Sequence, residues 1–215
     1  MKGSRGKFIT FEGGDGCGKS TQLEFVRAWL MEEGRDFLMT REPGGTAIGE
    51  KIRDLLLDRK YSEMTDMAEL LLYAAARAQL AREAIEPALE SGKHVICDRW
   101  VDSSLVYQGV AREMGDAVSA VNLYAAAGLF RPDATILLDM DPREAMARAA
   151  KNEGGDRIEA FGVEYQTKVR DGYLKLAARD KERFRVIDAA GSPEDVFSRV
   201  RETLETIVGA EARDG

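Results

Sequence analysis

The sequence predicts an α/β fold in which a five-stranded parallel sheet lies between two layers of helices. Short apolar runs of strand length alternate along the 215-residue chain with longer segments whose apolar residues recur at helical spacing. This alternation is typical of a parallel sheet, because a strand reaches its parallel neighbour through a crossover that is usually a helix. No linker or repeat divides the chain, so we expect one domain over residues 1–215. The predicted strands are residues 7–12, 36–40, 94–97, 134–138 and 184–188.

Each segment between these strands carries a helical pattern. The pattern that starts at residue 65 runs to about residue 90, and Pro87 is expected to kink or end that helix because proline lacks a backbone donor. Pro142 is well placed to open a helix that runs to about residue 151. The other predicted helices cover residues 23–30, 48–56, 103–110, 116–126, 165–176 and 196–207.

The turn after the first predicted strand has the pattern of a phosphate-binding loop. Its residues are Gly13, Gly14, Asp15, Gly16, Cys17, Gly18, Lys19 and Ser20, and a helical pattern follows them. Small residues let backbone N–H groups converge on anionic oxygens, and the start of a helix adds positive potential. Lys19 is expected to reach the β- and γ-phosphates, and the Ser20 hydroxyl to hold Mg²⁺. The sequence therefore predicts a three-layer P-loop fold that binds a nucleotide through residues 13–20 and Thr21.

Phosphoryl transfer also needs cationic groups that face this loop, because it depends on positioning and charge neutralisation. Arg99 follows the end of a predicted strand and Arg41 precedes a Pro-Gly-Gly turn, while Arg77 and basic residues between 148 and 157 are further candidates. Asp98 fits a residue that holds Mg²⁺ directly or through water. The carboxyl ends of parallel strands share one edge, so these residues are expected to gather there. The plainer alternatives are arginines paired with surface carboxylates and a structural carboxylate at position 98.

Composition excludes several classes of protein. The formal net charge of −7 argues against broad nucleic-acid binding, which needs a basic surface. The two cysteines lie in no metal or disulfide spacing, which indicates a reducing compartment, and a single histidine excludes a two-histidine zinc motif. The longest uncharged stretch, residues 117–130, is too short to span a membrane, and no signal peptide is expected. We expect a cytoplasmic protein that binds neither nucleic acid nor membrane.

Five stretches of the chain together resemble the thymidylate kinase family. They are the phosphate loop within residues 11–21, Arg-Glu-Pro-Gly-Gly-Thr at 41–46, Tyr-Ala-Ala-Ala-Arg at 73–77, the Asp-Arg-Trp, Ser-Ser and Tyr-Gln-Gly groups within 98–109, and Asp-Arg-Ile-Glu at 156–159. Many proteins share the loop alone, whereas the five stretches in this order are specific. The resemblance implies a Mg²⁺-dependent transfer of the γ-phosphoryl group of ATP to dTMP, which gives dTDP and ADP. It also implies a homodimer, for which the apolar positions of the helices at 45–57 and 65–90 are candidates.

The resemblance assigns roles to residues of the acceptor site. Asp15 matches an acidic residue near the sugar 3′-hydroxyl, and Arg41 and Arg99 match a pair that grips the monophosphate, for which guanidinium forks are suited. Periodicity alone would make Tyr73 a core residue and Arg77 a solvated one. Around the nucleoside, the matching residues are Tyr73 for stacking on thymine, Arg77 for a base carbonyl, Ser103 and Ser104 for the other base edge, Tyr107 for the ribose 2′ side, and the substrate-binding Gln108.

A mobile lid is expected at about residues 148–160. Family members whose phosphate loop lacks a basic residue, as this one does beyond its lysine, are expected to supply that charge from the lid. Here Asn152 stands where similar sequences have an arginine. We therefore expect Arg148 or Lys151 to take the catalytic role beside Lys19, Arg99 and Asp15, with Arg157 as a further candidate.

Other functions of the protein, and the role of Cys17, are open at this point. The acceptor could be another nucleoside monophosphate or a deoxynucleoside, and the chain could be a nucleotide-driven switch, although it has no Asn-Lys-x-Asp guanine motif. Cys17 is either a small residue whose N–H contacts phosphate or a thiol made reactive by the helix start.

Overall fold

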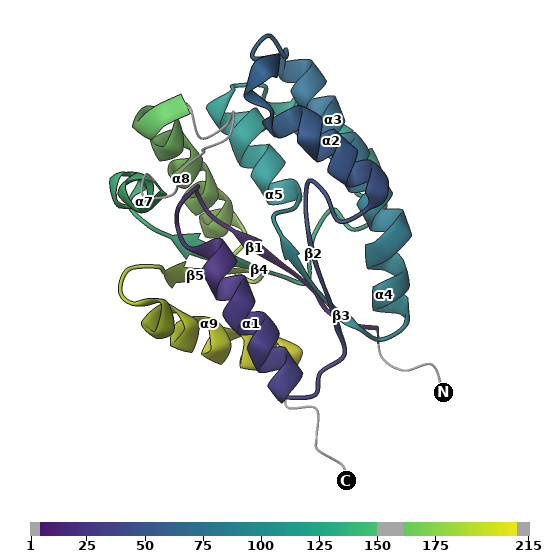
Figure 1. Ribbon diagram of the computed structural model, residues 1–215, viewed down its shortest axis with the longest axis vertical. Coiled ribbons are helices and arrows are strands. Elements are labelled where there is room, and N and C mark those ends of the chain that lie inside the picture. The colour runs from purple at the N-terminus through teal and green to yellow at the C-terminus, as the bar shows by residue number, and fades with distance from the viewer. Residues whose placement is uncertain (1–4, 150–160, 210–215) are drawn as a thin grey trace.

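The computed structural model describes residues 5–149 and 161–209 (Figure 1). Its centre is a five-stranded sheet with the order β2-β3-β1-β4-β5, in which every neighbouring pair is parallel. This confirms the predicted α/β class and the parallel sheet. The strands are β1 (Phe8–Glu12), β2 (Phe37–Arg41), β3 (His94–Asp98), β4 (Ala134–Asp139) and β5 (Phe184–Asp188).

Helices connect the strands and form the two outer layers. They are α1 (Lys19–Glu32), α2 (Ala47–Leu57), α3 (Asp66–Leu80), α4 (Glu86–Glu90), α5 (Val101–Ser104), α6 (Asp116–Ala125), α7 (Pro142–Ala149), α8 (Gly162–Arg179) and α9 (Pro193–Val208). A 3₁₀ turn (Arg59–Tyr61) follows α2, and π-helical segments follow α3 (Ala81–Ile85) and α5 (Leu105–Ala111). Among the helices of the described ranges, none combines the length and apolar composition that crossing a bilayer requires.

The long helical pattern after residue 65 forms a continuous run of α3, a π-helical segment and α4. Pro87 does not end it, since the helix continues to Glu90. The proline lies in the first turn of α4, directly after the π segment, where a missing N–H is tolerated.

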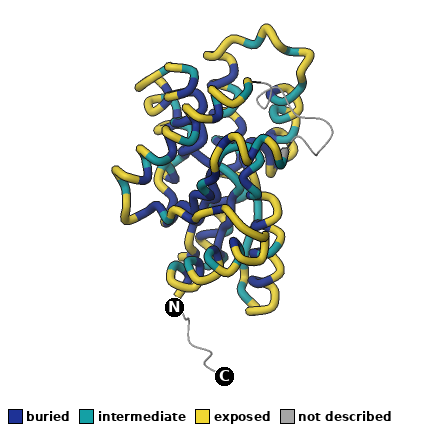
Figure 2. Tube along the Cα trace, turned by 90° about the vertical axis from the view of Figure 1, so that its left-hand side faces the viewer, coloured by how far each residue is buried: buried dark blue, intermediate teal, exposed yellow. Residues whose placement is uncertain are grey.

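The central strand β1 distributes its side chains between the two faces of the sheet. Ile9 and Phe11 pack with apolar residues of α1 and α9, which lie together below the sheet in Figure 1. Because side chains alternate along a strand, Phe8, Thr10 and Glu12 belong to the opposite face. Figure 2 shows that the buried residues run through the middle of the molecule, between the exposed outer turns of the helices.

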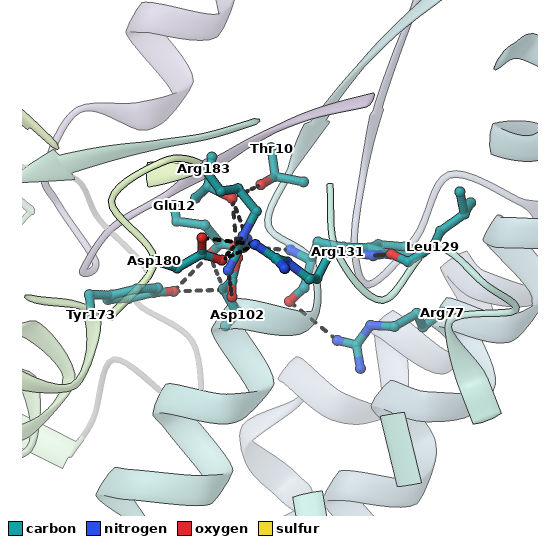
Figure 3. A network of polar contacts seen from close by, with 12 residues as sticks. Thr10, Glu12, Arg77, Asp102, Leu129, Arg131, Tyr173, Asp180 and Arg183 are labelled. Atoms are coloured by element: carbon teal, nitrogen blue, oxygen red, sulfur yellow. Dashed lines mark hydrogen bonds and ion pairs between the residues drawn. The ribbon is translucent and has the colours of Figure 1, made fainter. Parts of the chain in front are cut away.

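A buried polar network crosses this second face and ties α5 to the sheet (Figure 3). The Thr10 and Thr135 hydroxyls of β1 and β4 lie 3.0 Å apart, and Thr135 Oγ1 donates to Asp102 Oδ2 at 3.2 Å. Arg183 donates to both carboxylate oxygens of Asp102, at 2.5 and 3.0 Å. The network therefore fixes the start of α5 close to the ends of the central strands.

Glu12 ends β1 on this face and is fully buried. Its Oε1 accepts from the Trp100 backbone N–H at 2.8 Å, and its Oε2 accepts from Ser103 Oγ at 2.6 Å and from Tyr173 OH at 2.8 Å. Burial, with a smaller contribution from the Asp102 carboxylate, raises the pKa of Glu12 to about 7, although the Arg99 guanidinium acts in the opposite direction.

Glu12→Gln is expected to change how stability depends on pH. The glutamate pKa outside the fold is 4.5, so between that pH and about 7 the folded protein binds more protons than the unfolded chain. The free energy of unfolding therefore falls as the pH rises through this window, by about 3 kcal/mol from Glu12 alone. Chemical denaturation at about pH 5 and about pH 8 is expected to show a smaller loss of stability for the variant than for the parent. Equal losses in the two proteins would contradict the assignment.

Candidate active site

The phosphate loop joins β1 to α1 through glycines with positive φ. The angle is 146° at Gly13, 78° at Gly16 and 94° at Gly18, all in the region that favours glycine. Space is also short at Gly13, where a β-carbon would lie 2.6 Å from Leu138 O and 2.8 Å from Cys17 Sγ. The neighbouring strand β4 and the loop itself thus require glycine at position 13.

Lys19 begins α1, and its side chain lies against the loop. The residue is 8% exposed, and its Nζ donates to the carbonyl oxygens of Gly13 at 3.2 Å and Gly14 at 3.3 Å. Ser20 follows with an exposed side chain, as does Thr21. Gly18 offers the helix no side-chain cap, which leaves the first N–H groups of α1 suited to an anion.

Arg99 reaches the same loop from the end of β3. Its NH1 donates to Gly13 O at 3.0 Å, the oxygen that also accepts from Lys19. Its NH2 forms an ion pair with Asp15 Oδ1 at 2.6 Å. Two cations from different elements therefore converge on one carbonyl oxygen.

Asp15 collects further donors from the second face of the sheet. The Tyr107 hydroxyl donates to its Oδ1 at 3.2 Å, and Gln166 Nε2 from α8 donates to its Oδ2 at 2.7 Å. Sequence reasoning missed Gln166, a buried polar residue on a helix face that is otherwise apolar. That position within an apolar stripe was the only signal available.

A cavity of about 80 Å³ lies beside Asp15 and Arg99. It brings together every predicted substrate-binding residue except Arg41. Five polar side chains of its wall are buried, namely Glu42, Arg77, Ser103, Ser104 and Gln108. The predicted residues that line it are Asp15, Tyr73, Arg77, Arg99, Ser103, Ser104, Tyr107 and Gln108, joined by Glu42, Pro43, Arg53 and Leu57.

Arg77 is fully buried at the wall of this cavity. Its NH2 donates to Glu42 Oε2 at 2.5 Å and to Ser104 Oγ at 2.9 Å, and its NH1 donates to Asn122 Oδ1. Burial raises the pKa of Glu42, although Arg77 opposes that effect. Within the described part of the chain, Arg77 Nε is buried without an acceptor. A ligand carbonyl would satisfy this donor, which agrees with the role that the resemblance implies.

Ser103 contacts the polar network as well as the cavity. Its hydroxyl lies 2.8 Å from the Tyr173 hydroxyl and accepts from Arg99 NH1 at 3.2 Å, in addition to its bond to Glu12. Ser103, the predicted base-edge residue, therefore also supports the Arg99 guanidinium.

Arg41 lies in a different hollow, together with Ser20 and Asp98. Its guanidinium pairs with Glu50 at 2.8 Å, and both side chains are exposed. Asp98 Oδ1 is buried and has no hydrogen-bond partner among residues 5–149 and 161–209. Asp98 and Ser20 line the same hollow, and a carboxylate and a hydroxyl are oxygen ligands of the kind that Mg²⁺ prefers.

Arg53 of α2 is a second cation that sequence reasoning missed. It lines the same cavity as Arg99 and donates to Pro43 O at 3.0 Å. Its sequence signal was weak, because an arginine on an amphipathic helix is usually solvated.

The predicted lid falls mostly on residues 150–160, outside the described ranges, and Lys151 and Arg157 are among them. Arg148 lies in the last turn of α7 and pairs with Glu144 at 2.7 Å. Both side chains of that pair are substantially exposed, so it contributes little to stability.

The two cysteines are buried and unpaired. Cys17 is only 3% exposed. Because a reactive thiol needs access as well as a favourable charge, this burial favours its role as a small loop residue.

Comparison with known proteins gives the same family as the motifs. A family model described as thymidylate kinase matches residues 11–200. Thymidylate kinase of Thermoanaerobacter sp. (strain X514) is 51% identical over 86% of this chain and 90% of its own length. The thymidylate kinase of Pelotomaculum thermopropionicum is 46% identical over 97% of this chain and 99% of its own length. That of Marinomonas sp. (strain MWYL1) is 43% identical over 98% of this chain and 99% of its own length. The chain belongs to the thymidylate kinase family.

Proposed function

We propose that the protein phosphorylates dTMP to dTDP with ATP as the donor. The observation that supports this most directly is the shared Gly13 carbonyl, which accepts from Lys19 at 3.2 Å and from Arg99 at 3.0 Å. A donor site and an acceptor site that meet at one atom suit in-line transfer, since the two anionic ligands are brought together. The family supplies the identity of the acceptor.

The cationic groups divide between the two ligands. The backbone amides of the loop and Lys19 hold the phosphates of ATP, with Thr21 at the start of α1. Arg99 and Arg53 hold the phosphate of dTMP, and Arg41 approaches from the neighbouring hollow. Asp15 keeps the Arg99 guanidinium in place through its ion pair at 2.6 Å.

The remaining wall of the cavity accommodates the nucleoside. Tyr73 is half-buried at that wall rather than in the core, which suits stacking on thymine. Arg77 donates to a base carbonyl, and Ser104 and Gln108 complete the base end. Tyr107 lies against Asp15, where the resemblance places the sugar.

The reaction needs no general base or covalent enzyme intermediate. The attacking oxygen belongs to the dTMP phosphate and is already anionic. Catalysis then consists of alignment, charge neutralisation and exclusion of water.

Mg²⁺ is the cofactor that we propose for this site. Ser20 and Asp98 would hold it, because the first offers a hydroxyl and the second a buried carboxylate oxygen without a partner in the described ranges. Those ranges contain no cluster of three His, Cys, Asp or Glu side chains that could hold a metal. This fits Mg²⁺, which keeps several waters and is bound through few protein groups and the substrate phosphates. When bound, it neutralises charge on the transferred phosphoryl group.

We also propose that the chain forms one domain, since the hydrophobic clusters all pack on the same sheet.

A cytoplasmic location is proposed from the two unpaired cysteines.

An ADP-release assay with dTMP, dUMP, dCMP and thymidine tests the activity. We expect the highest kcat/KM with dTMP, loss of turnover with EDTA, and a decrease of about 100-fold in Arg99→Ala, because charged hydrogen bonds to a phosphate are strong. Arg201→Ala is the matched control, since this half-exposed arginine of α9 pairs only with Glu205 among described partners. ATP hydrolysis independent of any acceptor would instead favour a nucleotide-driven switch.

The lid residues are tested by Arg148→Ala and Lys151→Ala. A cation aimed at the transferring group contributes about 10³ to 10⁵ in rate, so one of these variants is expected to lose at least about 100-fold in kcat. Arg143→Ala, on the exposed side of α7, is the control. If both lid variants retain turnover within about twofold of the parent, the lid assignment is wrong.

The homodimer is proposed to form through α2 and α3. These helices pack together and expose apolar side chains, namely Ile48 (54%), Leu55 (41%), Met67 (47%) and Leu71 (51%). Leu71→Glu is expected to give a monomer in sedimentation velocity, because a charge at the centre of an apolar interface is costly. Val186→Glu, at a residue of similar exposure (48%) on β5, is the control and is expected to leave the dimer intact. A parent protein that sediments as a monomer would contradict the proposal.

A further inference from the structure

We propose that Glu69 sets the orientation of the Gln108 side-chain amide and thereby selects a pyrimidine that carries a hydrogen on N3, such as thymine, over cytosine. Glu69 is a positioning residue in this scheme, since it acts through Gln108. The inference rests on the proposed function and goes beyond it by stating how the base is distinguished.

The contact on which this depends joins α3 to the π-helical segment after α5. Gln108 lines the acceptor cavity and is 2% exposed, and its Nε2 donates to Glu69 Oε1 at 2.8 Å. Glu69 is completely buried, in the first turn of α3. Its other oxygen, Oε2, accepts from Arg112 NH2 at 2.8 Å. The carboxylate thus lies between an amide on one side and a guanidinium on the other.

The carboxylate of Glu69 determines which end of the Gln108 amide, the NH₂ group or the carbonyl oxygen, faces it. Glu69 forms an ion pair with Arg112 at 2.8 Å, and the carboxylate of such a pair only accepts hydrogen bonds. The NH₂ group of Gln108 must therefore face Glu69, and its carbonyl oxygen Oε1 is turned away from it. Across residues 5–149 and 161–209, no group donates a hydrogen bond to that oxygen. Gln108 consequently presents an acceptor to a ligand in the cavity.

Arg77 supplies the complementary donor at the same wall. Its Nε is buried without an acceptor within the described ranges, and both Arg77 and Gln108 line the cavity. A donor beside an acceptor matches the O4 carbonyl and the N3–H of thymine or uracil. Cytosine carries an amino group at C4 and an unprotonated N3, so it would place donor against donor and acceptor against acceptor. A site built to hydrogen-bond one pattern rejects the reversed one strongly, because its buried polar groups are left unpaired.

Glu69→Gln is the test, since it preserves shape while it permits the reversed arrangement. The carbonyl of the introduced amide can accept from Arg112, which leaves its NH₂ group toward Gln108. Gln108 then turns its carbonyl to that NH₂ group and its own NH₂ group to the cavity. We expect kcat/KM for dTMP to fall at least about tenfold and that for dCMP to rise, so that their ratio falls by about 100-fold or more.

Two further variants separate this effect from a general loss of structure. Asp66→Asn removes the other Arg112 partner, at 2.7 Å and half-exposed, and is expected to leave the dTMP to dCMP ratio within about twofold of the parent. Gln108→Leu removes the amide and is expected to lower the ratio through dTMP alone, without a gain for dCMP. Thermal unfolding of each variant monitors the fold.

The outcomes distinguish this inference from the proposed function. If the parent acts on dTMP and a folded Glu69→Gln variant keeps its ratio, or loses both activities equally, the inference is overturned. If Glu69→Gln does not fold, an unchanged ratio in Gln108→Leu overturns it instead. If the parent does not phosphorylate dTMP at all, the proposed function itself fails.

Discussion

The arrangement of the site depends on one backbone carbonyl, that of Gly13, which holds two cations from different parts of the chain. Lys19 comes from the helix after the loop and Arg99 from the end of the adjacent strand. Two like charges this close repel each other, so the arrangement requires negative charge nearby, and Asp15 supplies it at 2.6 Å from Arg99. The requirement explains why the loop carries an acidic residue although its ligand is an anion.

The second face of the sheet supports this arrangement with polar rather than apolar contacts. Glu12 bonds to Ser103 and Tyr173, and the Arg183–Asp102 pair fixes the helix that carries Ser103. Buried ion pairs add little net stability compared with apolar packing, but breaking one is costly. Their use here is positional, because hydrogen bonds fix direction in a way that apolar contacts do not.

The sequence predicted the parts of the fold and the site that follow from local patterns. The periodicity of strands and helices predicted the parallel sheet, and the spacing of the glycines and Lys19 predicted the phosphate loop. Arg99 could be singled out from the sequence because it follows the end of a strand, where a parallel sheet gathers its functional groups. These features are set by neighbours along the chain.

What the sequence did not predict depends on contacts between segments far apart along the chain. Arg53 and Gln166 lie on amphipathic helices, where a polar residue is usually solvated, and only the packing of α2 and α8 brings them to the site. Glu69 could not be recognised because its partner Gln108 is remote in sequence. The sequence also gave no sign of the ion pair between Arg41 and Glu50, which lie on different elements.

Arg99 has a backbone conformation that is unfavourable for a residue with a side chain. Its φ is 68°, in a region that costs a side-chain-bearing residue about 1 to 2 kcal/mol, and it is held there by bonds from Arg99 N to Phe11 O at 3.0 Å and from Trp100 N to Glu12 at 2.8 Å. Glycine or asparagine would relax the main chain at that point. The guanidinium at position 99 therefore comes at the expense of backbone stability. A substitution to glycine or asparagine that stabilises this turn would remove the charged group from the site.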